Sequence, residues 1–138
     1  MVGKKGIKHN LKRPGDFSKV PLIFRENGSA TRLAMEAYIK KYKVNLGISL
    51  ELTSNEAVKQ AVLASLGFSI MPLIGLRNEI RNQDLEIIKM KGLPIITDWN
   101  LIRLKNKSYS PAAMAFRNYI LEAKDKIVSD QFSWYQKY

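Results

Sequence analysis

Hydrophobic and polar residues follow two alternating periods along the first two thirds of the chain, which predicts strands and helices in turn. Short apolar runs typical of buried or half-buried strands lie at 21–25, 48–52, 68–71 and 85–88. Helical spacing of apolar residues separates them, at 30–42, at 54–66 and from 72 to about 81. Strands that alternate with single helices predict an α/β fold, with a mostly parallel sheet flanked by helices.

The C-terminal third carries two more predicted elements. Alternating residues at 99–104 indicate a strand, and a polar loop at 105–109 follows it. Ser110 and Pro111 are typical of the N-cap and first residue of a helix, which we expect to run to about residue 127. Its apolar stripe is formed by Ala115, Phe116, Tyr119, Ile120, Ala123 and Ile127. The last ten residues, 129–138, form an aromatic-rich tail to which the pattern assigns no element.

Composition places the chain among globular proteins. It has 138 residues, 46% of them hydrophobic and 25% charged, enough for one domain with a real core. No cysteine is present, which excludes disulfides and thiolate metal sites and fits a reducing compartment. No apolar run is long enough to cross a membrane, and no signal peptide begins the chain. We therefore expect a soluble, cytoplasmic protein with no membrane partner.

The high positive charge makes a nucleic acid a candidate partner. The formal net charge is +11, and residues 1–19 hold six cations and one carboxylate. We expect these residues to form a flexible basic leader. No zinc-finger spacing, aromatic RNA-binding motif or helix-turn-helix pattern accompanies the charge. A solvated basic surface is therefore favoured over direct nucleic-acid binding.

Catalytic chemistry has little support in the sequence. The one histidine, His9, lies in the expected leader. Neither a nucleophile elbow nor a glycine-rich phosphate loop is present, and the carboxylates are scattered without metal-like pairing. We predict that the chain is not an enzyme and expect neither a metal site nor a cofactor.

Three strand-to-helix junctions are the candidate binding site. They are Gly28–Ser29 after the first strand, Thr53–Ser54 after the second and Met71–Pro72 after the third. In parallel α/β sheets, ligands bind beyond the carboxyl ends of strands, where helix N-termini present free N–H groups. Hydroxyls at a helix start suit a carboxylate, sulfate or phosphate. Plain N-capping explains the same residues, with either Thr53 or Ser54 placed to cap the second helix.

The same junctions lie in segments that resemble the effector domain of LysR-type transcriptional regulators. The first is PLIFRENGSATR at 21–32. The second runs from LTSNEAVKQAV at 52–62 to LGFSIMP at 66–72. The third joins WNLI at 99–102 to SPAA at 110–113 and to the Ala115–Phe116 pair. The resemblance covers about residues 21–127 and is greatest to the branch that regulates carbon-fixation operons.

The resemblance implies a periplasmic-binding-protein-like (type II) subdomain. Residues 20–128 would be the effector-binding subdomain, between the leader and the tail. A small anionic metabolite would contact Thr53 and Ser54 first, with Gly28, Ser29, Met71 and Pro72 nearby. Such regulators also have a DNA-binding domain, a linker helix and a first effector subdomain, which we expect this chain to lack. Contact with DNA would then be indirect, through a full-length regulator.

The missing subdomain also implies how the chain associates. The helix at 111–127 would pack on that subdomain in a complete regulator, so an isolated chain would expose its apolar stripe. We expect a homo-oligomer formed through this helix, with the tail covering part of the surface. Three functions stay open at this point: an effector-sensing module, a basic accessory protein that binds nucleic acid, and a remnant without separate activity.

Overall fold

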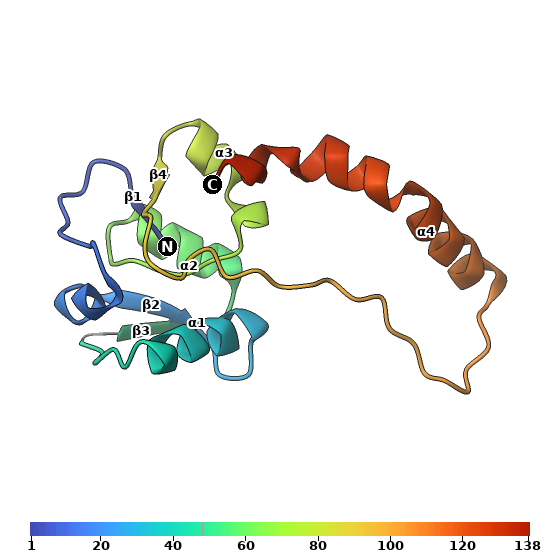
Figure 1. Ribbon diagram of the computed structural model, residues 1–138, viewed down its shortest axis with the longest axis horizontal. Coiled ribbons are helices and arrows are strands. Elements are labelled where there is room, and N and C mark those ends of the chain that lie inside the picture. Colours follow the sequence, from blue (N-terminus) through green and yellow to red (C-terminus); the bar gives the residue numbers. More distant parts are fainter. Residues whose placement is uncertain (48) are drawn as a thin grey trace. The chain divides into compact units, whose positions relative to one another are not determined.

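The computed structural model describes residues 1–47 and 49–138, without the side chain of Lys137. Ile48, the first residue of the strand predicted at 48–52, lies outside the described residues. The chain divides into two compact units, Met1–Ile95 and Ile96–Tyr138, hereafter unit 1 and unit 2. Figure 1 shows the strands gathered in unit 1 and one long helix in unit 2.

Unit 1 is built on a mixed arrangement of short strands. They are β1 (Val2–Lys4), β2 (Leu22–Arg25), β3 (Ser49–Leu52) and β4 (Leu85–Ile87). β2 pairs with β3 in parallel, and β1 pairs with β4 antiparallel. Residues 68 and 69 connect the two pairs, because Phe68 bridges Leu22 in parallel and Ser69 bridges Val2 antiparallel. The α/β class is confirmed, but β1, which the sequence analysis did not predict, makes the pairing mixed.

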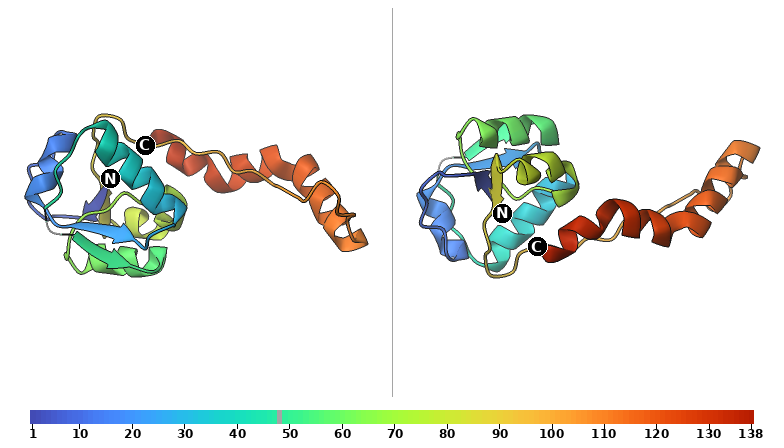
Figure 2. Two further views of the ribbon diagram at one scale, coloured as in Figure 1. Left: turned by 90° about the horizontal axis from the view of Figure 1, so that it is seen from below. Right: turned by 90° about the horizontal axis from the view of Figure 1, so that it is seen from above.

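Helices cover both faces of these strands. They are α1 (Ala30–Lys41), α2 (Asn55–Leu63) and α3 (Arg77–Arg81), with 3-10 helices η1 (Pro14–Lys19) and η2 (Leu73–Gly75). Because side chains alternate along β2, Phe24 joins one core cluster with Met35 of α1. Ile23 joins a second cluster with Val58 of α2. Figure 2 accordingly shows α1 and α2 on opposite sides of β2.

The predicted starts of α1 and α2 are confirmed, whereas the predicted end of α2 is wrong. Ser29 and Ser54 are the N-caps of α1 and α2, so Ser54 rather than Thr53 caps the second helix. α2 ends at Leu63 and not at Gly67, because Ser65 takes the left-handed backbone conformation at φ 65°. The single helix expected from residue 72 is two short pieces, η2 and α3.

The structure differs from the flexible leader expected at residues 1–19. β1 is paired, η1 is folded, and Phe17 is fully buried in the core. The buried carboxylate of Asp16 accepts hydrogen bonds from Lys19 Nζ at 2.9 Å and from the backbone N–H groups of Lys12 and Arg13. These bonds, that from Lys19 first, lower the pKa of Asp16 to about 2. The few apolar residues here are spaced too irregularly to give a periodic signal, although Met1, Val2, Leu11 and Phe17 are buried.

Unit 2 has one long helix and a segment without regular structure. α4 (Pro111–Phe132) is capped by Ser110, as predicted, and continues five residues past the predicted end at 127. The expected aromatic tail therefore belongs partly to α4 and partly to the 3-10 helix η3 (Ser133–Lys137). The strand predicted at 99–104 is wrong: Trp99 is 82% exposed and Ile102 87% exposed, and no described residue pairs with this segment. An alternating pattern forms a strand only where a neighbouring strand accepts its hydrogen bonds.

None of the described helices combines the length and the apolar character that crossing a bilayer requires.

A candidate ligand-binding edge

The structure brings the three predicted junctions to the same edge of the strands. In the parallel β2–β3 pair Arg25 lies opposite Leu52, so the turns that follow the two strands are neighbours. The Phe68–Ser69 segment runs parallel to β2 on its other side, and Met71 and Pro72 follow it at that edge. We call this edge, with residues 28–29, 53–54 and 71–72, the ligand edge (Figure 1).

Two serine hydroxyls lie at the ligand edge at the start of helices. Ser29 Oγ accepts a hydrogen bond from the backbone N–H of Arg32, and Ser54 Oγ accepts one from Ala57, each at 3.0 Å. A hydroxyl that accepts in this way still has its own hydrogen to donate. The helix N-termini add free N–H groups and a partial positive charge. Gly28, at φ 88°, makes the tight turn before Ser29.

The third junction is different in character. Met71 is half-buried and packs against the second core cluster, while Pro72 is exposed and has no N–H to donate. The 3-10 helix that follows Pro72 has only three residues. Met71 and Pro72 can therefore contribute an apolar wall to the ligand edge, whereas Ser29 and Ser54 contribute the hydrogen-bond donors. Thr53 is exposed beside Ser54 and takes no part in capping.

Arg25 joins the first two junctions, and sequence reasoning did not select it. Its Nη1 donates to Asn55 Oδ1 at 2.6 Å, and its Nε and Nη2 donate to the two carboxylate oxygens of Glu26 at 2.7 Å. The guanidinium group holds the pKa of Glu26 below its usual value, so the pair stays ionised. The signal was present in the sequence, because Arg25 and Glu26 belong to the motif that contains Ser29. Only the strand register, however, places Asn55 beside them.

A second ion pair fixes α2 to α3. Lys59 Nζ lies 2.7 Å from Glu79 Oε1 and 2.9 Å from Glu56 Oε2, and its side chain is only 14% exposed. The bond to Glu79, followed by that to Glu56, raises the pKa of Lys59. Since α2 begins at the second junction and α3 follows the third, this bridge holds the two junctions in a fixed relation.

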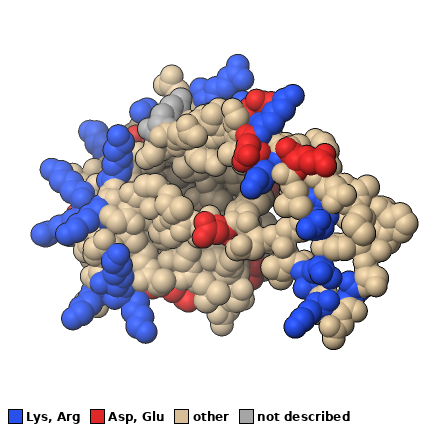
Figure 3. All heavy atoms as spheres, turned by 45° about the vertical axis from the view of Figure 1, so that its right-hand side comes forward, with Lys and Arg blue, Asp and Glu red and all other residues tan. Residues whose placement is uncertain are grey.

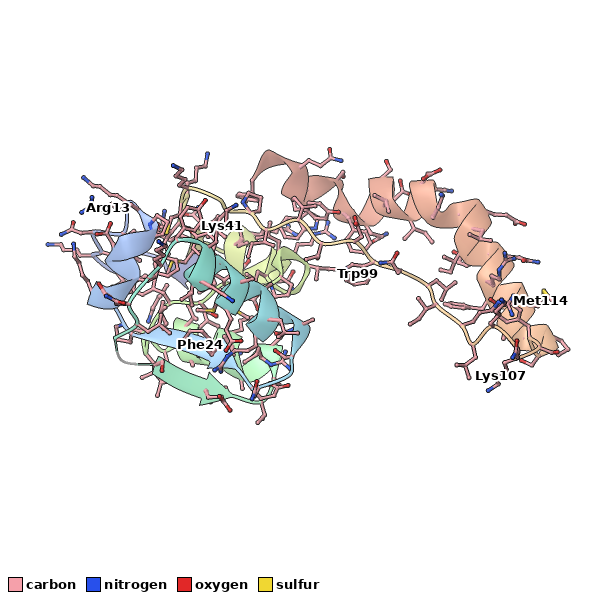
Figure 4. The ribbon with its side chains drawn as sticks, turned by 60° about the horizontal axis from the view of Figure 1, so that its bottom comes forward. Arg13, Phe24, Lys41, Trp99, Lys107 and Met114 are labelled. Carbon is pink, nitrogen blue, oxygen red and sulfur yellow. The ribbon has the colours of Figure 1, made fainter. Side chains whose placement is uncertain are left out.

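A hollow of about 200 Å³ lies elsewhere in unit 1, between α1 and β3. Phe24, labelled in Figure 4, and Arg32 line it, and none of the six predicted site residues does so. The Arg32 guanidinium lies over the Phe24 ring at 4.7 Å and is paired with Glu36 and Glu51. Two carboxylates pair with the Arg32 guanidinium, whereas one carboxylate, that of Glu26, pairs with Arg25, so this hollow is less suited to an anion than the ligand edge is.

The ligand edge is characterised by hydrogen-bond donors. It offers hydroxyl and backbone donors together with the ion-paired guanidinium of Arg25. Within residues 1–47 and 49–138, no group of three acidic or histidine side chains is placed to hold a metal ion. His9, the one histidine, accepts from the backbone N–H of Leu11 and packs edge-on against Phe68, inside unit 1.

Known transcriptional regulators resemble this chain in sequence. The sequence profile of the LysR substrate binding domain matches residues 8–125. The HTH-type transcriptional activator CmpR of Synechocystis sp. is 39% identical over 109 residues, 79% of this chain and 36% of CmpR. The RuBisCO operon transcriptional regulator of Acidithiobacillus ferrooxidans is 36% identical over 110 residues, 80% of this chain and 36% of the regulator. The chain thus spans about a third of the length of these relatives, which are regulators and not enzymes.

Two solved structures resemble the fold. The Synechocystis PCC6803 CcmR regulatory domain, in complex with 2-PG, has a TM-score of 0.79 and 28% identity, covering 88% of this chain and 60% of that one. The effector binding domain of QuiR, in complex with shikimate, has a TM-score of 0.65 and 20% identity, covering 91% of this chain and 60% of that one. At 20% identity, the similarity to QuiR supports the fold and no shared ligand. Together they confirm the periplasmic-binding-protein-like class predicted from the sequence.

Proposed function

Because the chain belongs to the LysR substrate-binding domain family, we propose that it is the effector-sensing part of a cytoplasmic LysR-type transcriptional regulator. It binds a small anionic metabolite, carrying a carboxylate or a phosphate, at the ligand edge. It performs no reaction, and other parts of the regulator recognise the DNA sequence. The observation that carries the proposal is the convergence of two capping serines, Ser29 and Ser54, on one edge beside Arg25.

The donors at the ligand edge support an anion in preference to a neutral ligand. Two helix N-termini there can share one anionic group, because helix N–H groups and serine hydroxyls both donate. The guanidinium of Arg25 is held in place by Asn55 and Glu26, so little ordering is needed when a ligand arrives. The 2-PG bound by the similar CcmR regulatory domain suggests 2-phosphoglycolate as the first probe.

We expect 2-phosphoglycolate to stabilise the folded chain against heat and the Ser54→Tyr substitution to abolish the effect. A ligand present at ten times its dissociation constant adds about 1.4 kcal/mol to the free energy of unfolding. For a unit of this size, that raises the melting temperature by several degrees. Ser54 is exposed, so tyrosine fills the ligand edge without entering the core. Differential scanning fluorimetry with 2-phosphoglycolate, phosphate and sulfate measures the shifts.

Ser110→Tyr is the matched control for this prediction. Ser110 caps α4 in the same way, accepting from the Ala113 N–H at 3.2 Å, but it lies in unit 2. Its variant should respond to 2-phosphoglycolate like the unaltered chain. An equal loss of response in both variants would show that removal of a helix cap, and not a change at the ligand edge, causes the loss. That result would contradict binding at the ligand edge.

We also propose that the chain self-associates through the helix predicted at 111–127. α4 carries exposed apolar side chains along its length: Met114, Phe116, Tyr119, Leu121 and Val128. The segment before it adds Trp99 and Ile102. Monomeric proteins rarely expose apolar residues in such density. The aromatic rings of the tail contact one another, with Trp134 5.9 Å from Tyr135 and 6.3 Å from Tyr138.

The double substitution Phe116→Glu and Tyr119→Glu is expected to shift the chain toward monomer. These residues are 59% and 58% exposed, so the change removes apolar surface and adds repelling charge without disturbing a core. Sedimentation velocity at several concentrations measures the effect. The control is Leu33→Glu, which alters an exposed residue of α1 in unit 1. A monodisperse monomer for the unaltered chain at high concentration would contradict the proposal.

A further inference from the structure

Part of the positive charge of unit 1 is gathered on a folded surface. We define the basic face by Lys12, Arg13 and Lys19, from the N-terminal segment, with Lys40, Lys41 and Lys43, from the end of α1; all six are exposed. Figure 3 shows Lys and Arg side chains crowded at the left of the molecule, with few acidic side chains among them. Figure 4 marks Arg13 and Lys41 on the two contributing segments.

Packing holds these two segments together. The Phe17 ring of η1 stacks on Tyr38 of α1 at a centroid distance of 5.7 Å. Gly47 approaches Ser18 so closely that an added Cβ would lie 2.9 Å from the Ser18 carbonyl oxygen. Tyr38 also donates from its hydroxyl to the backbone carbonyl of Lys91 at 2.7 Å, which ties α1 to the segment that follows β4. The two segments that carry the cations are therefore held against each other by these contacts.

The basic face lies at the opposite edge from the ligand edge. η1 leads directly into the amino end of β2, whereas Ser29 follows the carboxyl end. α1 starts at the ligand edge and runs back, so Lys40 and Lys41 occupy its last turn. The basic face and the ligand edge can therefore be occupied at the same time.

Few carboxylates neutralise the basic face. Asp16 pairs with Lys19 at 2.9 Å and with Arg13 at 3.9 Å. Among the described residues, no carboxylate oxygen lies within 4.0 Å of the side-chain nitrogen of Lys12, Lys40, Lys41 or Lys43. A cluster of cations left without counter-charges attracts a polyanion and gains from the release of its counterions.

The distribution of side chains favours a nucleic acid over a lipid surface. Membrane-surface binding combines cations with a row of exposed apolar side chains. Within residues 4–19 and 40–47, the exposed large apolar side chains are Ile7, at 39%, and Leu46, at 45%, one in each segment. Exposed lysines and arginine on a fixed scaffold instead suit the phosphates of a duplex, which need charge and no apolar contact.

We propose that the basic face binds the phosphate backbone of double-stranded DNA, without reading sequence. In a regulator this contact would hold unit 1 on DNA next to the site that the DNA-binding domain recognises. The binding does not depend on an effector, so it is separate from the function proposed for the ligand edge.

The test compares two double variants of the full chain that change the net charge equally. Lys12→Glu with Lys41→Glu alters the basic face, and Lys124→Glu with Lys126→Glu alters exposed residues of α4 in unit 2. Fluorescence anisotropy with a random-sequence DNA duplex measures the dissociation constant over a series of salt concentrations. Circular dichroism melts establish that each variant is folded, and the Lys12→Gln, Lys41→Gln pair replaces the first variant if it is not.

We expect the basic-face variant to bind DNA roughly tenfold more weakly or worse at 0.1 M salt. The slope of the logarithm of the binding constant against the logarithm of the salt concentration should fall in magnitude by about two. The α4 variant should stay within about twofold of the unaltered chain. An equal loss in both variants would show that net charge alone drives binding and would overturn the proposal. So would tighter binding to phosphatidylserine vesicles than to DNA, which would identify a membrane-binding surface.

Discussion

Replacing Phe17 with alanine is expected to lower the free energy of unfolding of unit 1 by about 3–5 kcal/mol. Phe17 is fully buried in the first core cluster, where its ring stacks on Tyr38. Alanine leaves a cavity between η1 and α1 that the paired strands cannot close. Urea denaturation followed by circular dichroism measures the change.

The matched control for Phe17 is Leu33→Ala. Leu33 is 57% exposed on α1 of the same unit, so its truncation should alter stability by less than about 0.5 kcal/mol. Comparable, small effects at both positions would mean that residues 1–19 are the flexible leader expected from the sequence and not part of the core.

Replacing Gly67 with alanine is expected to lower the free energy of unfolding by about 2–3 kcal/mol. An added Cβ would lie 2.6 Å from the carbonyl oxygen of Pro21 and 3.2 Å from Ile23 Cγ1. The Phe68 N–H donates to that same carbonyl at 3.0 Å, and the Phe68 carbonyl accepts from the Ile23 N–H at 2.8 Å. Relieving the clash separates the Phe68–Ser69 segment from β2 and breaks the connection between the two strand pairs. The same denaturation experiment measures the loss.

Gly75→Ala is the control for Gly67, because an added Cβ there meets no heavy atom within 4 Å. It should leave stability unchanged or raise it slightly, since alanine restricts the unfolded chain. A stability change at Gly67 no greater than that at Gly75 would contradict the close contact described between Gly67 and Pro21.

Local sequence patterns predicted most helices and strands of unit 1. They failed where a strand pairs with a segment that is distant in sequence. The starts of α1, α2 and α4 were correct because a capping serine acts within three residues of itself. β1 was missed because a three-residue strand such as Val2–Lys4 has no periodicity, and its pairing with β4 lies more than 80 residues away. The prediction for residues 99–104 was wrong in the opposite sense, because a strand was predicted where none forms. Its alternating pattern has no partner strand among the described residues.

The candidate site was likewise predicted from the sequence only in part. The three junctions were found from the order of strands and helices, and the parallel register of β2 and β3 places the first two side by side. Arg25 was not selected, because its bond to Asn55 spans 30 residues and depends on that register. The six predicted residues stay a proposal as ligand contacts. Met71 is the weakest of them, since its side chain packs against the second core cluster.

Titration of the isotope-labelled chain with 2-phosphoglycolate, followed by amide chemical shifts, tests most directly whether the ligand edge binds an anion. We expect the largest changes at the N-termini of α1 and α2, from Ser29 to Arg32 and from Ser54 to Ala57, and their loss in the Ser54→Tyr variant. Changes confined to the hollow between α1 and β3, around Leu46 and Leu50, would contradict this expectation. So would the absence of any shift at a high ligand concentration.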